Sequence, residues 1–271
     1  MRLTAGGRTD SARAEEWDHY GSHWVNHRPH QLWRKHSDSV NVALIEQWLP
    51  RTGLRRVLKT DLFDEAVSEG ICPAIAKRAR EVVGLDVSSA VLRQASKSCV
   101  ALSPAGADVR LLPFRSHSFD AVVSLSTLDH FDSKADVLAA LREIHRVLAP
   151  GGTLILTLDN LANPVIAIRN ALPYRVTHAA GLVPYPVGQT FGPAEAMDLV
   201  REAVFEVVEH TAVMHAPRVL AVPLMGAFDR NGSSGIARTL SRAAMWFERL
   251  RPLPSRFITG HFIAIRAVKP G

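Results

Sequence analysis

The polar residues of this chain that could do chemistry stand at the ends of apolar segments in its first 160 residues. Asp61 follows the segment 55–60, and Asp86 ends the segment 81–87. Parallel strands bring their carboxyl ends to one edge of an α/β sheet, and ligands bind there, where the strand order reverses. An acid at the end of the second strand, about 20 residues after the first loop, can accept hydrogen bonds from both hydroxyls of a ribose. This spacing predicts a nucleoside site.

Apolar runs alternate with segments of helical period through the middle of the chain, which predicts a parallel sheet covered by helices on both faces. The expected strands are 55–60, 81–87, 107–112, 120–126, 153–159, 205–214 and 260–268. The expected helices are 64–79, 89–99, 134–148, 193–203 and 235–250. The stretch after residue 160 is rich in proline and shows no clear period, so we expect an irregular cap over the sheet, where substrates are usually met.

The first loop of this predicted sheet lies within RVLKTDLFDEAVSEG at 56–70, and its turn carries Asp61, Asp64 and Glu65 but no glycine. A dinucleotide brings a doubly negative pyrophosphate, which needs the close approach of backbone N–H groups that glycines permit. Three acids would repel that group. A nucleoside with a cationic group suits this loop better, because Asp61 or Asp64 can pair with the cation.

Three stretches, taken together, resemble the class I S-adenosylmethionine-dependent methyltransferases: VVGLDVS at 82–88, ADVRLLPFRSHSFDAVVSLSTLDHF at 107–131 and LREIHRVLAPGGTLILTLDN at 141–160. The resemblance covers residues 54–160 well. It implies an α/β fold with a Rossmann-like, doubly wound sheet of seven strands, the last antiparallel, and S-adenosylmethionine as the cofactor. An N-terminal helical lid and a cap after the fifth strand complete the expected fold.

By this resemblance Asp86 binds the ribose, Asp108 binds the adenine amino group with Val109 beside the ring, and residues 124–127 line the methionine side. In the family such an N-terminal segment often closes the pocket with an aromatic residue, here Tyr20 or Trp33. The residues expected to contact the cofactor are Tyr20, Trp33, His36, Lys59, Thr60, Asp61, Asp86, Val87, Asp108, Val109, Ser124, Ser126 and Thr127.

The opening loop departs from the family pattern. Lys59 stands at the usual place of an acid, and Asp61, Phe63 and Glu65 stand at the places of three glycines. One interpretation is that the loop has lost its function and the protein binds no cofactor; the retained acids downstream favour binding. Lys59, or Arg34 or His36 of the lid, could take the carboxylate of the cofactor.

The N-terminal segment 15–40 packs four large aromatic residues among histidines, and His19, His23 and His27 recur every four residues. That spacing could place metal ligands on one helical face. No acid or cysteine joins them at a ligand spacing, and Pro29 interrupts the helix, so we expect an amphipathic lid and no metal site.

Candidates for catalysis and for the methyl acceptor follow the fourth and fifth predicted strands. His130 could act as a general base on an acceptor hydroxyl, with Asp129 beside it; the alternative is that both order the loop. Alignment of nucleophile and methyl group can suffice without a base. The residues expected to contact the acceptor are Asp159, Asn160, Arg169, Tyr174 and Tyr185, with Arg169 binding an anionic group or pairing with Asp159.

Composition bounds these assignments. The chain has 271 residues, 47% of them hydrophobic, so we expect one compact unit: a lid at 1–50, a cofactor-binding core at 51–160, a cap at 161–192 and a completing part at 193–271. The net charge is +6, yet residues 61–199 hold 15 acidic and 12 basic residues, and arginine-rich patches such as Arg249 and Arg251 suggest solubilised helices rather than nucleic-acid contacts.

Cys72 and Cys99 show no metal spacing and are interpreted as buried apolar residues rather than as a disulfide. No apolar run reaches the roughly 18 residues of a membrane span, and the N-terminus lacks a signal-peptide core. We therefore expect a cytoplasmic protein without a membrane partner; the oligomeric state, a homodimer included, stays open.

The sequence thus predicts a methyltransferase that acts on a small-molecule acceptor, an O-methyltransferase of secondary metabolism, because the proline-rich cap suits a sizeable, partly apolar ligand. The alternatives are a cofactor-binding protein that catalyses a non-methylating reaction such as a cyclisation or only binds a partner, a nicotinamide-dependent enzyme, and a nucleic-acid methyltransferase.

Overall fold

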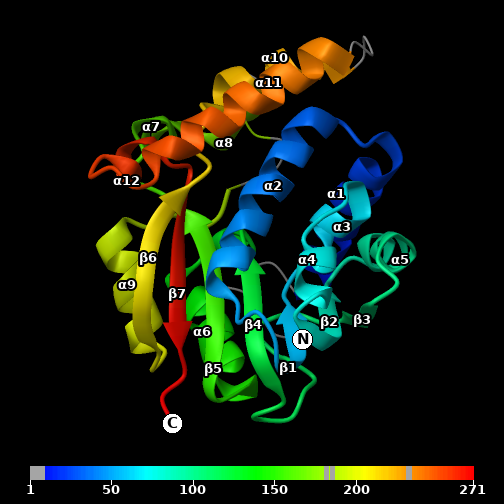
Figure 1. The fold of residues 1–271 in the computed structure, drawn as a ribbon, viewed down its shortest axis with the longest axis vertical. Helices are drawn as coiled ribbons and strands as arrows, with labels where there is room; N and C mark the ends of the chain where they lie inside the picture. The colour runs from blue at the N-terminus through cyan, green and yellow to red at the C-terminus, as the bar shows by residue number, and fades with distance from the viewer. Residues whose placement is uncertain (1–9, 180–182, 184–186, 230–233) are drawn as a thin grey trace.

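The computed structural model describes residues 10–179, 183, 187–229 and 234–271. Its strands are β1 (Leu54–Lys59), β2 (Ala79–Asp86), β3 (Leu102–Gly106), β4 (Phe119–Leu125), β5 (Leu148–Asp159), β6 (Glu206–Val213) and β7 (Phe262–Val268). They form one seven-stranded sheet in the order β3-β2-β1-β4-β5-β7-β6, with β7 antiparallel to both of its neighbours. The predicted Rossmann-like sheet with an antiparallel last strand is confirmed (Figure 1).

The helices before β5 are α1 (Asp10–His27), α2 (Gln31–Trp48), α3 (Phe63–Val67), α4 (Cys72–Ala76), α5 (Ser89–Ser98), η1 (Leu128–His130) and α6 (Lys134–Val147). Those after it are α7 (Pro164–Ala171), α8 (Tyr174–Ala179), α9 (Pro193–Glu202), α10 (Arg218–Asp229), α11 (Ser234–Trp246), η2 (Phe247–Leu250) and α12 (Arg256–Thr259). Within the described residues, no helix is long and apolar enough to cross a bilayer.

Two apolar cores lie on opposite faces of the sheet, because successive side chains of each strand point to opposite sides. Val57 packs in the core that includes residues of α2, α4 and α5, whereas the next residue, Leu58, packs in the core that includes residues of α6 and α9. The order β3-β2-β1-β4 reverses direction between β1 and β4, so the carboxyl ends of these two strands flank the crevice where a ligand is expected.

The third strand differs from the prediction. It spans Leu102–Gly106 rather than 107–112. At Asp108 the side chain accepts the backbone N–H of Arg110 at 2.8 Å, a local turn that ends extended structure. Pro104 within β3 is tolerated because β3 is an edge strand. Asp108 therefore follows the strand instead of opening it.

The single predicted helix 64–79 is two short helices, α3 and α4. Gly70 has a φ of 65°, and this turn lets Oε1 of Glu65 accept the N–H groups of Ile71 and Cys72 at 3.0 and 3.1 Å. A Cβ on Gly70 would lie 2.6 Å from that oxygen. A glycine is thus needed here to seat the glutamate.

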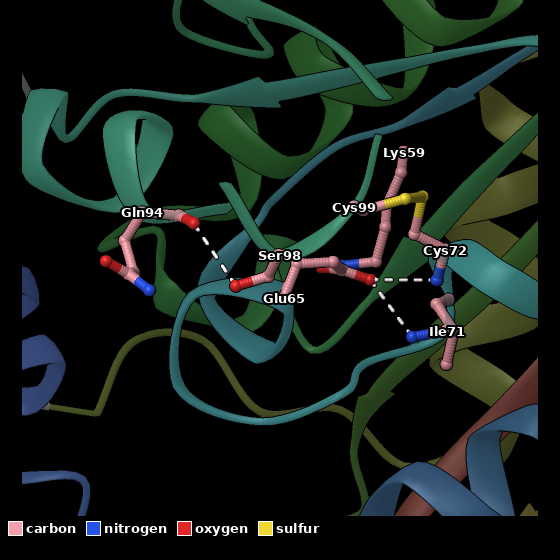
Figure 2. The surroundings of a disulfide bond; sticks show 7 residues. All are labelled: Lys59, Glu65, Ile71, Cys72, Gln94, Ser98 and Cys99. Atoms are coloured by element: carbon pink, nitrogen blue, oxygen red, sulfur yellow. Dashed lines mark hydrogen bonds and ion pairs between the residues drawn. A yellow bond between two sulfur atoms is a disulfide. The ribbon is translucent and has the colours of Figure 1, made fainter. Parts of the chain in front are cut away.

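Cys72 and Cys99 form a disulfide, so the prediction that they are unpaired was wrong (Figure 2). Cys72 opens α4, and Cys99 is the residue directly after α5. Their 27-residue separation carries no spacing signal, but the fold brings their Cα atoms to 6.6 Å, within bridging reach.

Candidate functional site

A cavity of about 570 Å³ lies beyond the carboxyl ends of β1 to β5. Its wall can be divided at the reversal of strand order. The β1–β3 half includes Thr60, Asp61, Phe63, Asp64, Asp86, Val87, Gly106, Asp108 and Val109. The β4–β7 half includes Leu125, Ser126, Thr127, His130, Phe131, Thr157, Met214, Arg218 and Phe262. Residues of α1, α2 and the start of α5 complete the wall.

Asp86 is oriented by backbone groups at the end of β2. Its Oδ2 accepts the N–H of Leu62 at 3.0 Å, and its Oδ1 accepts the N–H of Ser88 at 2.8 Å. Burial, with a contribution from Asp61, raises the pKa of Asp86 to about 6, while these two N–H groups oppose the rise. Each carboxylate oxygen has a further lone pair that can accept a bond from a ligand hydroxyl.

Asp108 and Val109 follow β3. The Asp108 carboxylate is held by Arg110, whose Nη2 lies 2.6 Å from Oδ2, and Arg110 also forms an ion pair with Asp136 at 2.9 Å. Val109 is buried and lines the cavity. Asp108 thus presents a fixed, shared carboxylate to the cavity rather than a mobile one.

A chain of hydroxyl groups joins the ends of β1 and β4. Thr60 donates to Ser124 at 2.8 Å and lies 3.1 Å from the Thr127 hydroxyl, which in turn donates to Asp61 at 3.1 Å. Ser124 is fully buried and acts behind the cavity wall. The arrangement fixes Asp61 and Thr127 on the cavity surface.

The glycine-free loop is built around a buried ion pair. Nζ of Lys59 lies 2.9 Å from Oε2 of Glu65, and both side chains are almost fully buried. Burial opposes the charge of Lys59, but the carboxylates of Asp61, Glu65 and Asp64 raise its pKa overall. Figure 2 shows that Glu65 lies close to the disulfide, beside Ile71 and Cys72. Contrary to expectation, Lys59 points into this pair and does not line the cavity, so it is not placed to contact a ligand there.

The N-terminal helix is anchored to the core by Asp18. Its Oδ1 accepts from the Ala90 N–H at 3.0 Å and from the Ser88 hydroxyl at 2.8 Å, at the start of α5. A Cβ on Gly21 would lie 2.8 Å from Ser88 and Val91, so α1 and α5 touch closely. This seat places the aromatic residues Trp17, Tyr20, Trp24 and Trp33 of α1 and α2 on the cavity wall.

Arg34 and His36 of the lid, which were both proposed to bind the cofactor's carboxylate, differ in their exposure to the cavity. Arg34 lines the cavity; its Nη1 lies 3.2 Å from Oδ1 of Asp64, and its guanidinium lies over the rings of Trp24 and Phe63. His36 is buried away from the cavity, and burial lowers its pKa to about 4. His36 is therefore neutral near pH 7 and is no partner for an anion.

The histidines of α1 do not form a metal site with their neighbours. His23 and His27 stack with their ring centres 4.3 Å apart, and the described residues contain no group of three or more side chains that could hold a metal ion.

In the β4–β7 half, His130 lines the cavity and lies 4.9 Å from the ring of Trp17. Ser126 has a φ of 51°, and its N–H donates to the Thr157 hydroxyl at 2.9 Å. Asp129 does not line the cavity: it is buried and accepts from the Ser126 hydroxyl at 3.0 Å. Burial, with the nearby Asp159, raises the pKa of Asp129 to about 8.

A polar network lies behind Arg218. Asp159 is paired with Arg169 at 2.6 Å, and Nε2 of His261 lies 3.7 Å from Asp159. Arg218 donates to Nε2 of His261 at 3.3 Å, and burial lowers the pKa of His261 to about 3, so this ring is neutral. Arg218 lines the cavity, and its charge helps to lower the pKa of Asp159, although within the described residues the two side chains do not come within ion-pair distance.

The residues expected to contact the acceptor lie elsewhere. Asn160 is buried and donates to the carbonyls of Phe257 and Gly260, and Arg169 is bound to Asp159. Arg169 and Tyr174 border a separate hollow of about 190 Å³. Tyr185 lies outside the described residues. Sequence analysis missed Arg218, Thr157, Met214 and Phe262; only Thr157, two residues before Asp159, carried a usable signal.

Comparisons with known proteins bear on the family and the fold. Residues 66–156 match the family described as "Methyltransferase domain". Over 45 residues the chain is 47% identical to "Probable tRNA methyltransferase 9B" of Mus musculus. This match covers 17% of this chain and 10% of that protein. The chain thus matches only about a tenth of the length of that relative.

Two solved structures share the fold. The "possible histamine N-methyltransferase" of Thermotoga maritima is similar with a TM-score of 0.60 and 19% identity, over 93% of this chain and 99% of that one. The (4+2)-cyclase SpnF is similar with a TM-score of 0.57 and 19% identity, over 86% of this chain and 80% of that one. At such identities the likeness shows the fold, and one fold hosts different reactions.

Proposed function

We propose that this chain, which belongs to the class I S-adenosylmethionine-dependent methyltransferases, transfers a methyl group to an oxygen atom of a small-molecule acceptor. The observation that carries the proposal is the lining of the β1–β3 half, where Asp61, Asp64, Asp86 and Asp108 surround one cavity. A cationic nucleoside suits four carboxylates, whereas a diphosphate would be repelled by them.

The residues present fit the cofactor group by group. Asp86, already oriented by two backbone N–H groups, would accept the ribose hydroxyls, and Asp108 with Val109 would hold the adenine. Asp61 and Asp64 would pair with the positive charges, and Arg34 would take the carboxylate. When bound, S-adenosylmethionine supplies an electrophilic methyl group on a positively charged sulphur.

The chain itself would orient the acceptor and exclude water. Trp17, Tyr20 and Trp24 of the lid cover the cavity, and removal of water strengthens the electrostatic contacts inside it. His130 is the side chain that could hold the proton of an acceptor hydroxyl, since it lines the cavity and Asp129 does not. If His130 is the base, His130→Ala should lower the rate about 100-fold or more; a loss of only a few fold would restrict it to ordering the loop.

Arg218 supports a class of acceptor. It is the cation of the β4–β7 half, and no carboxylate lines that half among the described residues. A fixed guanidinium held by a neutral histidine favours an acceptor with an anionic group, such as a carboxylate or phenolate, within an otherwise apolar pocket. Within the cavity itself a nucleic-acid acceptor is disfavoured, because Arg218 alone in this half does not form a phosphate-binding track.

The test is incubation of the protein with methyl-labelled S-adenosylmethionine and a panel of phenols, each with and without a carboxylate. We expect labelled methyl ethers and equal amounts of S-adenosylhomocysteine, with the carboxylate-bearing members preferred and that preference lost in Arg218→Gln. Label that appears only on nitrogen or nucleic acid would contradict the proposed acceptor.

A non-methylating activity is the competing function, since the (4+2)-cyclase SpnF shares this fold. In that case the same cavity would bind the cofactor and steer a rearrangement of the ligand beside it. Tight binding of S-adenosylhomocysteine together with release of none from S-adenosylmethionine, across the whole panel, would favour this second function.

A further inference from the structure

The helices at one end of the molecule expose an unusual share of its apolar side chains. We define the cap surface as the exposed parts of residues 161–179, 218–229 and 234–259, which form α7, α8, α10, α11, η2 and α12. Of the 19 large apolar side chains exposed among the described residues, 14 belong to these three segments. Scattered exposed apolar residues are normal, but a concentration of this kind marks an interaction surface.

Helix α10 shows the pattern most clearly. Its exposed positions are Val219, Leu220, Pro223, Leu224 and Ala227, which recur at helical spacing and are all apolar. Leu220 and Leu224 are 68% and 50% exposed. On the other side Met225 is buried in the core shared with α2. The exposed face of α10 is therefore as apolar as a helix face that packs in a protein core.

The exposed charged side chains of the same segments are all positive. Asp229 and Glu248 are the only acidic residues of the sequence within 161–179 and 218–259, and both face inward. Asp229 accepts the N–H of Leu32 at 3.0 Å, and Glu248 accepts the N–H groups of Met214 and His215 at 3.2 and 2.8 Å. The exposed charged side chains of the cap surface are therefore arginines, namely Arg175, Arg238, Arg242 and Arg249.

We propose that the cap surface docks on an anionic lipid bilayer. Apolar side chains of α10 and α11 would enter the interface between headgroups and acyl chains, while the arginines bind anionic headgroups. A second copy of this chain is a poorer occupant, because the same cationic surfaces would repel each other. This inference revises the expectation of no membrane partner, and the interpretation of Arg249 as a helix-solubilising residue.

The placement of the helices agrees with a single docking face. Figure 1 shows α7, α8, α10, α11 and α12 together at the end of the molecule toward which the parallel strands point, away from the C-terminus. Helix α10 begins at Arg218, which lines the cavity. Docking at this end would hold the β4–β7 half close to the bilayer. The inference does not depend on methyl transfer.

Flotation of the full chain with vesicles tests it. We expect binding to vesicles of phosphatidylcholine with phosphatidylglycerol, weak binding to phosphatidylcholine alone, and loss of the difference in about 1 M salt, where the screening length is ~3 Å. Leu220→Asp with Leu224→Asp should weaken binding about tenfold or more. Arg242→Gln with Arg249→Gln should weaken it by about fivefold for each arginine, on the anionic vesicles alone.

Val100→Asp is the matched control, because Val100 is 99% exposed and lies far along the chain from the cap surface; it should bind as the wild type does. Thermal melting establishes that each variant is folded. The proposal is overturned if the folded wild type does not bind anionic vesicles at low salt, or if the α10 variant binds them as the wild type does. It is also overturned if light scattering shows a dimer that Leu220→Asp with Leu224→Asp disperses.

Discussion

The two halves of the cavity differ in charge and in the way they are built. Four carboxylates line the β1–β3 half, with Arg34 of α2 beside them, whereas Arg218 is the cation of the β4–β7 half. Under the proposed function the first half meets a cationic nucleoside and the second an acceptor with an anionic group. The opposite charges of the two halves would also disfavour exchange of the two ligands between them.

The halves also differ in their supports. The β1–β3 half is held from within by the Lys59–Glu65 pair, by the Cys72–Cys99 disulfide and by the N–H groups on Asp86. The β4–β7 half is held by side chains that reach between distant segments, as in the pair Asp159–Arg169 and the bonds from Met214 and His215 to Glu248. Changes in either half should therefore have separable effects on stability and on cofactor binding.

The largest stability effect is expected in the β1–β3 half, for Glu65→Gln. Loss of this carboxylate removes the ion-pair partner of the buried Lys59 ammonium at 2.9 Å, and leaves it the Asp61 carboxylate at 3.8 Å and the weaker influence of Asp64. Breaking a buried ion pair from one side costs about 3–5 kcal/mol. Urea unfolding measures the loss. Glu81→Gln is the control, because its pair with Arg56 is about 40% exposed and worth about 1 kcal/mol or less. Equal losses in the two variants would refute the role of the buried pair.

In the β4–β7 half, Asp159→Asn should lower the free energy of unfolding by about 1.5–3 kcal/mol, because the partly buried Arg169 loses its charged partner. Affinity for S-adenosylhomocysteine should stay within about twofold, since the change lies outside the β1–β3 half. Asp198→Asn, in an exposed pair with Arg201 at 2.9 Å, serves as control. A large drop in cofactor affinity for Asp159→Asn would contradict the conclusion that the two halves act separately.

The smallest of these effects concerns pH. The pKa of Asp129 is raised to about 8, so between its ordinary pKa and that value the folded protein keeps a proton that the unfolded chain has lost. Stability then falls as pH rises through this range. Relative to Asp129→Asn, the wild type should lose about 1–2 kcal/mol between about pH 5 and pH 8, since Asp159 shares the titration. A constant difference between the two proteins across this range would contradict the buried, protonated state.

Sequence analysis located the β1–β3 half well, because its residues stand directly at strand ends. Asp61 and Asp86 were predicted from their positions at strand ends and Asp108 from the family resemblance, since it was expected to open the third strand; all three line the cavity. The sequence could not show that Lys59 turns inward, because that depends on Glu65 and on the positive φ of Gly70 six and eleven residues later. The disulfide was missed for a similar reason, since only the fold brings Cys72 and Cys99 together.

The β4–β7 half was predicted less well. Arg218 and Phe262 lie more than 90 residues beyond the end of the fourth strand, with several helices and strands in between, so no local spacing connects them to the site. Polar residues after β5 seemed suited to an acceptor, but Asn160 and Arg169 satisfy backbone carbonyls and Asp159 instead. Buried polar groups need hydrogen-bond partners. In this part of the chain, the side chains that were predicted to contact the acceptor serve as such partners instead.

The central claim is that the acidic half binds a cationic sulphur nucleoside through Asp86. Calorimetry with S-adenosylhomocysteine should show binding to the wild type, a loss of about 100-fold or more in Asp86→Ala as two charge-assisted hydrogen bonds disappear, and unchanged affinity in Arg218→Gln. Asp86→Asn, which keeps the shape of the side chain, should also bind weakly, and melting curves should show both Asp86 variants folded. Equal affinity of wild type and Asp86→Ala, or tighter binding of a nicotinamide dinucleotide by the wild type, would contradict the account.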